Sequence, residues 1–143
     1  MNLVFYEIGT IKEEELRFAV ISAIYQNKWV FVRHKDRMTW EIPGGHREIG
    51  EDIMKTAKRE LFEETGAVRG EIIPLYDYCI NDSSEKLFGR LFFSKIIELD
   101  QLPESEISEV SFFEMLPGNL TYAEIQPLLF RKTMEFMKSK KDN

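Results

Sequence analysis

The stretch that most constrains this chain is a glycine turn followed closely by an acidic helix. The run Pro43, Gly44 and Gly45 predicts a tight turn whose backbone can approach another group, because glycine carries no Cβ. Residues 51–65 predict the helix, since acids lead its first turn and good helix formers fill it. Gly66 suits the left-handed position that ends a helix. The sequence therefore predicts a backbone turn at a fixed distance from one helix.

Three glutamates of this predicted helix indicate its chemistry. At about 100° per residue, Glu60, Glu63 and Glu64 fall within an arc of about 100° on one face. Like charges four residues apart repel each other, and acids near a helix C-terminus oppose the helix dipole. Taken alone, these acids would indicate a solvated helix face. Beside a glycine turn they indicate a site for a hard divalent cation, which prefers carboxylate oxygens.

The spacing of these residues resembles the Nudix box. Gly45, Glu51 and residues 59–67 match the pattern G-x5-E-x7-R-E-U-x-E-E-x-G-U, in which U is a bulky aliphatic residue. All the fixed polar and glycine positions match. The one departure is Ala67, which is smaller than the usual aliphatic residue and concerns packing behind the helix.

The resemblance implies a role for each polar residue of the box. Magnesium or manganese would be bound by three side chains and one main-chain carbonyl, those of Glu60, Glu63, Glu64 and Gly44. Arg59 would pair with Glu51 and hold the loop on the helix. The alternative for that pair is an ordinary surface ion pair, which is compatible with the same role.

Hydrolysis of a phosphoric anhydride also needs a base that takes a proton from the attacking water. In related enzymes this base is a box glutamate or an acid on a distal loop. Residues 103–109 hold Glu104, Glu106 and Glu109, of which we favour Glu106; the alternative is a solvated acidic loop. The expected catalytic set is Glu63, Glu60, Arg59 and Glu106.

The residues that border the glycine turn are candidates for binding substrate. Gly45 allows close approach, and His46 and Arg47 are expected to contact phosphate, unless they are simply solvated loop residues.

The remaining sequence predicts a mixed α/β domain, and the resemblance implies an α/β/α sandwich around a mixed β-sheet. Strands are expected over 16–25, 28–33, 39–42, 70–80, 86–98 and 109–115. A closing amphipathic helix is expected over 121–138, followed by a frayed tail over 139–143. Its expected inward residues are Ile125, Leu128, Leu129, Met134 and Met137.

Size and charge restrict the possible partners. The 143 residues fit one domain, and the net charge of −6 argues against broad binding to nucleic acid.

No apolar run is long enough to span a bilayer, and the start of the chain does not resemble a secretory signal. The single cysteine, Cys79, is expected to be buried, and a cytoplasmic location is the simplest expectation. Monomer and homodimer both remain open.

The substrate is the least constrained part of the prediction. Downstream of the box, ADP-ribose pyrophosphatases resemble one another in a proline, and dinucleoside polyphosphate hydrolases in a tyrosine. Residues 80–85 of this chain contain neither marker. This favours the MutT-type branch, which cleaves nucleoside triphosphates, including 8-oxo-dGTP, to monophosphate and pyrophosphate. Asn119 resembles a purine-reading asparagine, with a turn or cap residue as the alternative. A Nudix enzyme for another nucleoside diphosphate derivative and a non-catalytic nucleotide-binding module stay open. Three aromatic residues are expected in the core rather than stacked on a base: Phe18, Tyr78 and Phe88.

Overall fold

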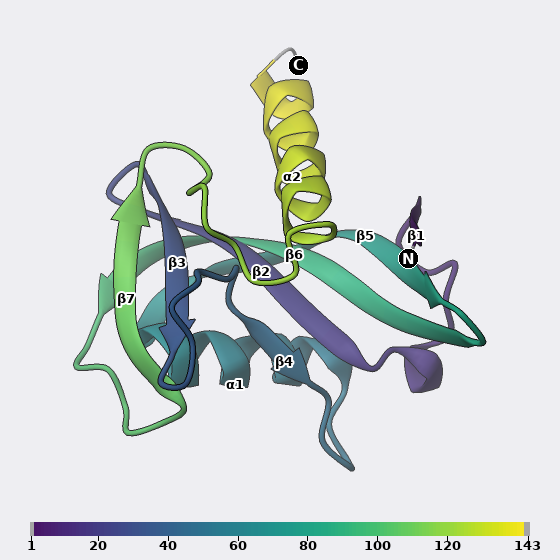
Figure 1. Cartoon of the computed structure of the whole chain (residues 1–143), viewed down its shortest axis with the longest axis horizontal. Helices are drawn as coiled ribbons and strands as arrows, with labels where there is room; N and C mark the ends of the chain where they lie inside the picture. The colour runs from purple at the N-terminus through teal and green to yellow at the C-terminus, as the bar shows by residue number, and fades with distance from the viewer. Residues whose placement is uncertain (1, 142–143) are drawn as a thin grey trace.

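The computed structural model describes residues 2–141, and within them a mixed seven-stranded sheet lies between two helices (Figure 1). Helix α1 covers one face of the sheet and helix α2 stands on the other, which confirms the predicted α/β/α sandwich. The strands are β1 (Asn2–Tyr6), β2 (Phe18–Tyr25), β3 (Lys28–His34), β4 (Gly44–His46), β5 (Ala67–Asp82), β6 (Glu85–Leu99) and β7 (Ile107–Phe113). The helices are the short 3-10 turn η1 (Glu13–Glu15), α1 (Ile53–Thr65) and α2 (Gln126–Lys141).

The centre of the sheet is a parallel pair between two strands that are far apart in the sequence. Strand β2 runs parallel to β6, which forms a long antiparallel hairpin with β5. On its other side β2 has two partners: its first three residues pair with β4, and its last two pair with β3. Because β3 diverges from β2 in this way, the short strand β4 can lie against the centre of the sheet and face α1.

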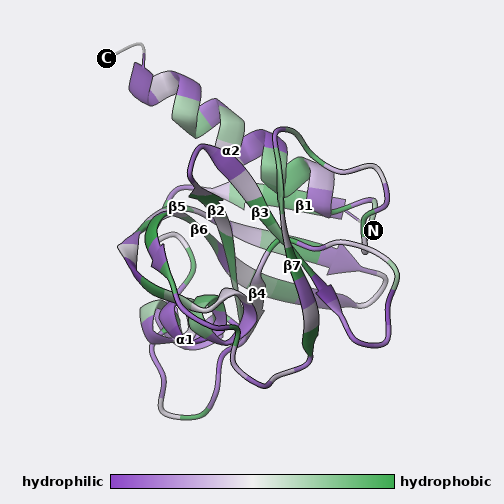
Figure 2. Cartoon of the chain, turned by 90° about the vertical axis from the view of Figure 1, so that its left-hand side faces the viewer, coloured by the Kyte–Doolittle hydropathy of each residue, from purple (hydrophilic) through white to green (hydrophobic). Residues whose placement is uncertain are grey.

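Each helix closes a separate part of the core. Ile53, Ala57 and Leu61 of α1 are buried in a cluster with residues of β2 and β6. Leu129 and Phe130 of α2 are buried in a second cluster on the opposite face. The C-terminal part of α2 projects away from the sheet, and polar colouring predominates there (Figure 2).

Local sequence signals explain where the hairpin and α1 begin and end. Gln26 and Asn27 adopt positive φ angles of 50° and 66°, as the predicted tight hairpin turn between β2 and β3 requires. The side chain of Asp52 accepts a hydrogen bond from the Lys55 amide and so caps the N-terminus of α1. Gly66 ends the helix with φ of 82°, as predicted.

The predicted strand over 39–42 is wrong. Trp40 forms an isolated parallel bridge with Leu120, and Glu41 forms an isolated antiparallel bridge with Val32, so no continuous ladder exists there. The strand lies instead at β4, in the predicted glycine turn itself. The sequence reading also missed β1, which pairs with β5, and placed β7 two residues too late.

The last helix begins later and ends later than predicted. Tyr122 has φ of 52°, which is incompatible with a helix, and Pro127 suits a first helical turn because proline lacks an N–H. The helix continues to Lys141; residues 142–143 of the predicted tail lie outside the described residues. Ile125 and Leu129 are buried as predicted. Met134 is exposed, because at this turn of α2 it is Thr133 that is buried against the sheet, where it donates to Ser22.

Two smaller expectations are resolved by burial. Cys79 and Tyr78 are buried as predicted, whereas Phe18 and Phe88 are only half-buried. Between residues 2 and 141, no helix has the length and apolarity needed to cross a membrane.

A buried carboxylate fixes the loop before η1 to the sheet. Asp77 of β5 is fully buried and accepts hydrogen bonds from the backbone amides of Gly9 and Ile11, at 3.1 and 3.2 Å. Its other partner is Arg90 of β6, whose Nε lies 2.6 Å from Oδ1. Buried charges are stable only when they are paired and hydrogen-bonded, so this carboxylate holds three segments together.

We expect the substitution Asp77→Ala to lower the free energy of unfolding by about 3–5 kcal/mol, because it leaves Arg90, whose side chain is only 14% exposed, without its partner. Urea unfolding monitored by circular dichroism measures the change. The matched control is Glu98→Ala, which breaks the exposed pair of Glu98 with Arg69 on the same two strands and should change stability by less than about 1 kcal/mol. Equal effects of the two substitutions would contradict the role assigned to Asp77.

Candidate active site

The two glycines of β4 bring the main chain into contact with carboxylates of α1. The amide of Gly44 donates to Oε1 of Glu64 at 2.9 Å. A Cβ added to Gly45 would lie only 2.3 Å from the carboxyl carbon of Glu60, so any larger residue would displace that side chain. The predicted turn therefore lies directly on the acidic face of the helix, as a strand rather than a free loop.

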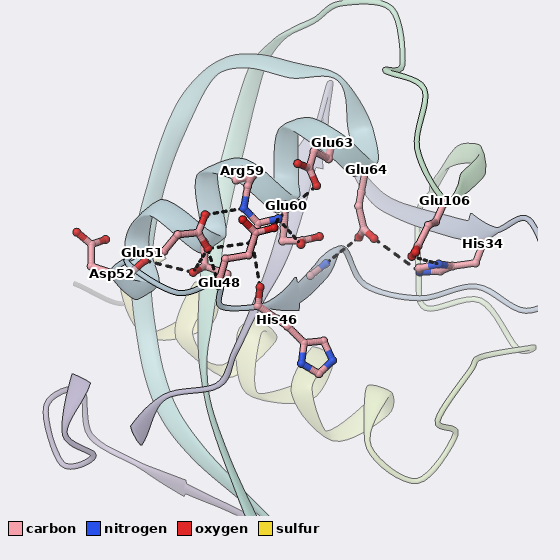
Figure 3. A network of polar contacts seen from close by, with 12 residues as sticks. His34, His46, Glu48, Glu51, Asp52, Arg59, Glu60, Glu63, Glu64 and Glu106 are labelled. Atoms are coloured by element: carbon pink, nitrogen blue, oxygen red, sulfur yellow. Dashed lines mark hydrogen bonds and ion pairs between the residues drawn. The ribbon is translucent and has the colours of Figure 1, made fainter. Parts of the chain in front are cut away.

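Arg59 is the centre of the ionic network that holds the loop on α1 (Figure 3). Its Nε and Nη2 donate to the two oxygens of Glu51 at 2.5 and 2.9 Å, which confirms the predicted pair. Its Nη2 also donates to the main-chain carbonyl of His46 at 2.9 Å. Its Nη1 reaches Glu60 at 2.7 Å and Glu63 at 3.3 Å. One guanidinium thus fixes the loop that follows the glycine turn, together with two of the three box acids.

These contacts have consequences for ionisation. The hydrogen bonds from Arg59 lower the pKa of Glu51 from its ordinary 4.5 to about 2, and they raise the pKa of the guanidinium itself. At Glu60 burial dominates and raises the pKa, although Arg59 acts in the opposite direction. Glu51 is therefore a firmly ionised anchor, whereas Glu60 is a carboxylate that lacks full compensation for its burial.

Glu64 is the most strongly perturbed acid of the site. Glu64 is only 6% exposed, and this burial raises the pKa of its carboxyl group to about 8. The amide of Gly44 opposes this shift, while the nearby carboxylates of Glu60, Glu41 and Glu106 reinforce it. A group that is this costly to ionise beside other acids would be stabilised by a local positive charge.

His34, at the end of β3, brings two further acids to Glu64. Its Nε2 lies 3.4 Å from Glu41 and 3.6 Å from Glu64, and its Nδ1 lies 3.9 Å from Glu106 (Figure 3). Glu41 is buried and also pairs with Arg37. Sequence reasoning missed His34 and Glu41 because neither belongs to the box; the fold brings them there from β3 and the segment before β4.

The distal acids differ in their surroundings. Glu106 extends from the segment before β7 toward His34, although its side chain is 89% exposed. Glu109 lies within β7 and pairs with Arg33 at 3.3 Å, which directs it away from the box acids. Glu104 is exposed in the preceding loop. Of these three acids, Glu106 is the one that lies beside His34.

The donor set fits a hard divalent cation in its chemistry. Carboxylates of Glu60 and Glu64 lie against the glycine turn, and those of Glu41 and Glu106 are close to Glu64. As the side chains stand, no three acidic, cysteine or histidine groups among residues 2–141 are arranged to bind an ion. Glu63 and Glu60 are instead oriented by Arg59. Oxygen ligands in excess of nearby cations are the type of set that Mg²⁺ and Mn²⁺ select.

The predicted phosphate-contacting residues point away from the acids. The ring of His46 packs edge-on against Phe18, with 4.6 Å between ring centroids, and Figure 3 shows it turned away from the glutamates. His46, Phe18 and Phe88 line a cavity of about 380 Å³ next to the glycine turn. Arg47 donates to the main-chain carbonyl of Glu14 at 2.8 Å and so fixes η1 to the loop.

Asn119 lies in the connection that precedes α2. Its side-chain amide donates to the carbonyl of Met38 at 3.1 Å, and its own carbonyl accepts from the Trp40 amide. Nearby, Arg37 lies over the ring of Tyr122 at 5.4 Å. Asn119 is therefore a turn residue that joins two loops; its amide oxygen has no partner among the bonds of the described residues.

The pairing of Glu51 with Arg59 predicts a pH-dependent contribution to stability. The pKa of Glu51 is lowered in the folded chain, so its ionised form favours folding. This contribution is complete above the ordinary value of 4.5 and is lost as the pH falls toward 2. We expect Glu51→Gln to lower the free energy of unfolding by about 1–2 kcal/mol at pH 7, with a difference that shrinks below pH 4.5.

Urea unfolding of wild type and variant at several pH values measures this difference. The control is Glu48→Gln, because Glu48 is exposed and lies 3.6 Å from the same guanidinium. A difference that is constant across the pH range would exclude the proposed linkage.

Comparison with known proteins identifies a family that this chain matches. The NUDIX domain profile matches residues 15–125, which include β2 to β7 and α1. A Lactococcus lactis subsp. cremoris protein named "Probable DHNTP pyrophosphohydrolase" is 28% identical over 115 residues, which are 76% of this chain and 69% of that protein. A Bacillus subtilis protein named "Putative 8-oxo-dGTP diphosphatase YtkD" is 32% identical over 98 residues, which are 68% of this chain and 61% of that protein.

Solved structures agree on the fold. A mutant form of the Bacillus subtilis pyrophosphohydrolase BsRppH has a TM-score of 0.78 at 22% identity, with 93% of this chain and 90% of that chain covered. A UDP-X diphosphatase has a TM-score of 0.68 at 24% identity, with 90% of this chain and 68% of that chain covered. Since the family profile spans the glycine turn, the acidic helix and most of the sheet, the chain belongs to the Nudix hydrolase family.

Proposed function

We propose that this chain hydrolyses nucleoside triphosphates, including oxidised forms such as 8-oxo-dGTP, to the nucleoside monophosphate and pyrophosphate. The observation that carries the proposal is the contact of the half-buried carboxylate of Glu60 and the buried carboxylate of Glu64 with the glycine turn. Members of the family generally use divalent metal ions, and this site has the oxygen donors for one.

We assign the metal to the box residues and propose Mg²⁺ or Mn²⁺ as the ion. Glu60, Glu63, Glu64 and the carbonyl of Gly44 would hold it. When bound, it would neutralise phosphate charge and lower the pKa of a water molecule. Arg59 then has a positioning role, since it orients Glu60 and Glu63 and holds the loop through Glu51.

The chain's own acids complete the proposed reaction. Water attacks a phosphorus of the triphosphate, the anhydride bond breaks, and pyrophosphate leaves. A carboxylate oxygen of Glu106 accepts the proton of that water, a step that contributes about 10²–10⁴-fold in typical enzymes. Glu106 is supported in this role by its place beside His34, which also lies against Glu64.

Two observations support a triphosphate as substrate. The two curated relatives described above carry names that refer to triphosphates or their diphosphatase reaction. The turn near Gly45 is bordered by His46 and Arg47 on one side, and Asn119 lies in a separate loop beside Arg37. We propose that phosphate lies beside this turn, where His46 and Arg47 reach it only after they leave Phe18 and Glu14. Asn119 would contact the base through its amide oxygen. The net charge of −6 supports a free nucleotide, rather than nucleic acid, as the partner.

A substrate panel tests the proposal directly. Unmodified and oxidised nucleoside triphosphates, ADP-ribose and dinucleoside polyphosphates are incubated with the full chain and Mg²⁺, and the products are separated by ion-exchange chromatography. We expect monophosphate and pyrophosphate from triphosphates, no activity in EDTA, and a loss of about 10²-fold or more in Glu63→Gln. Preferred cleavage of ADP-ribose or a dinucleotide would replace the proposed substrate. Activity that survives in Glu63→Gln would contradict the proposed site.

The role of Glu106 is tested by two matched variants of the same acidic segment. Glu106→Gln should lower kcat by about 10²–10⁴-fold with little change in KM, because it removes the proton acceptor and keeps the shape of the side chain. Glu104→Gln should leave both parameters near their wild-type values, since that side chain is exposed and has no role in the proposal. Equal kcat values for the two variants would exclude Glu106 as the base.

A further inference from the structure

A second cavity lies on the α1 side of the sheet, away from the glycine turn. Its volume is about 540 Å³, within the range of about 300–1,000 Å³ that is typical of ligand sites. It is formed between the C-terminal half of α1, the first part of β5 and the last part of β6. None of its lining residues belongs to the acids of the active site.

Much of the lining of this cavity is apolar, and two of its apolar side chains are exposed to solvent. Leu61 and Ile96 are buried core residues, and Ile72 packs against the same cluster. Phe62 and Val68 are 43% and 46% exposed, although they are large apolar side chains. Isolated exposed apolar residues are ordinary on protein surfaces, but here two of them border one cavity.

An unsatisfied hydroxyl lies inside this apolar cavity. Ser94 lines it and is fully buried. Among residues 2–141, Ser94 Oγ is the one buried side-chain oxygen or nitrogen without a hydrogen-bond partner. The serine at the corresponding depth on the other face, Ser22, accepts a hydrogen bond from Thr133 at 2.9 Å. Since burying an unpaired hydroxyl is unfavourable, Ser94 lacks a hydrogen bond that a polar atom bound in the cavity could supply.

The charge around this cavity is opposite to that of the whole chain. Lys58 and Arg69 line it, and no acidic residue does, although the net charge of the chain is −6. Both side chains are exposed, and Arg69 has only a weak pair with Glu98, at 3.4 Å. Positive groups beside an apolar cavity favour an anionic ligand with an apolar body.

We propose that this cavity is a binding site for a small organic anion. Its apolar body would lie among Phe62, Val68 and Ile96, its anionic group would lie near Lys58 and Arg69, and a polar atom would pair with Ser94. The ligand would contact α1 on the face opposite the glycine turn, so this site is independent of the proposed hydrolysis.

Binding is tested with 8-anilinonaphthalene-1-sulfonate, an aromatic anion, on the full-length protein. Fluorescence titration should give saturable binding at one site, and ¹H–¹⁵N NMR spectra should shift around residues 58–72 and 94–96. We expect Val68→Glu to weaken binding about tenfold or more, because it puts a negative charge at the apolar mouth. Lys58→Glu should weaken it about threefold or more, through loss of charge complementarity.

The matched control is Ile97→Glu. Ile97 is 51% exposed and follows Ile96, but its side chain does not line the cavity. This variant should bind the probe as wild type does. Equal affinity of Val68→Glu and wild type, or NMR shifts confined to other parts of the chain, would overturn the proposal.

A second measurement tests the premise without any ligand. Ser94→Ala removes a hydroxyl that has no partner, so its thermal midpoint should equal or exceed that of wild type. A clear decrease in the midpoint would show that the hydroxyl is already satisfied within the folded chain, and the inference from Ser94 would then fail.

Discussion

The site depends on the repulsion between carboxylates that the fold buries side by side. Glu64 is almost fully buried, and Glu60, Glu41 and Glu106 all raise the cost of ionising it. Few arginine side chains reach these acids: Arg59 is shared among several of them, and Arg37 pairs with Glu41. A cluster of this kind is stabilised when a further positive charge binds, which is the role proposed for the divalent cation.

The fold assembles this cluster because one strand, β2, pairs along the same edge with two different strands. Strand β2 pairs with β4 at its beginning and with β3 at its end, and β4 carries the glycines. The absence of a Cβ on Gly45 lets the main chain lie on the carboxylate of Glu60. Arg59 joins Glu51 on the loop to the acids of α1, so that the turn and the helix form one unit. The remaining acid, Glu106, arrives from the segment before β7.

The features that could be predicted from the sequence are formed by residues that lie close together in the chain. The Arg59–Glu51 pair, the hairpin turn at Gln26 and Asn27, and the end of α1 at Gly66 each depend on residues within one or two turns of each other. The layered α/β/α fold was predicted only through the resemblance to the Nudix box. No local signal marks His34 and Glu41, because they become neighbours of Glu64 only when β3 and the segment before β4 meet α1.

The errors have equally specific causes. The segment 39–42 contains residues that favour strands, yet Trp40 and Glu41 bridge to different partners and form no ladder. The pattern of the final helix extends back to Thr121, but the left-handed conformation of Tyr122 delays its start. Hydrophobic periodicity placed Met134 in the core, but the inward position at this turn is taken by the polar Thr133, which is buried and donates to Ser22.

The central claim is that the buried acids of α1 and the glycine turn bind a divalent cation. It is tested most directly by titrating the protein with Mn²⁺ and measuring the free ion by electron paramagnetic resonance, without nucleotide. The wild-type chain should bind the ion with a defined stoichiometry, and Glu64→Gln should weaken binding about tenfold or more, because it removes a ligand from the centre of the cluster. Wild-type affinity in Glu64→Gln would contradict the account.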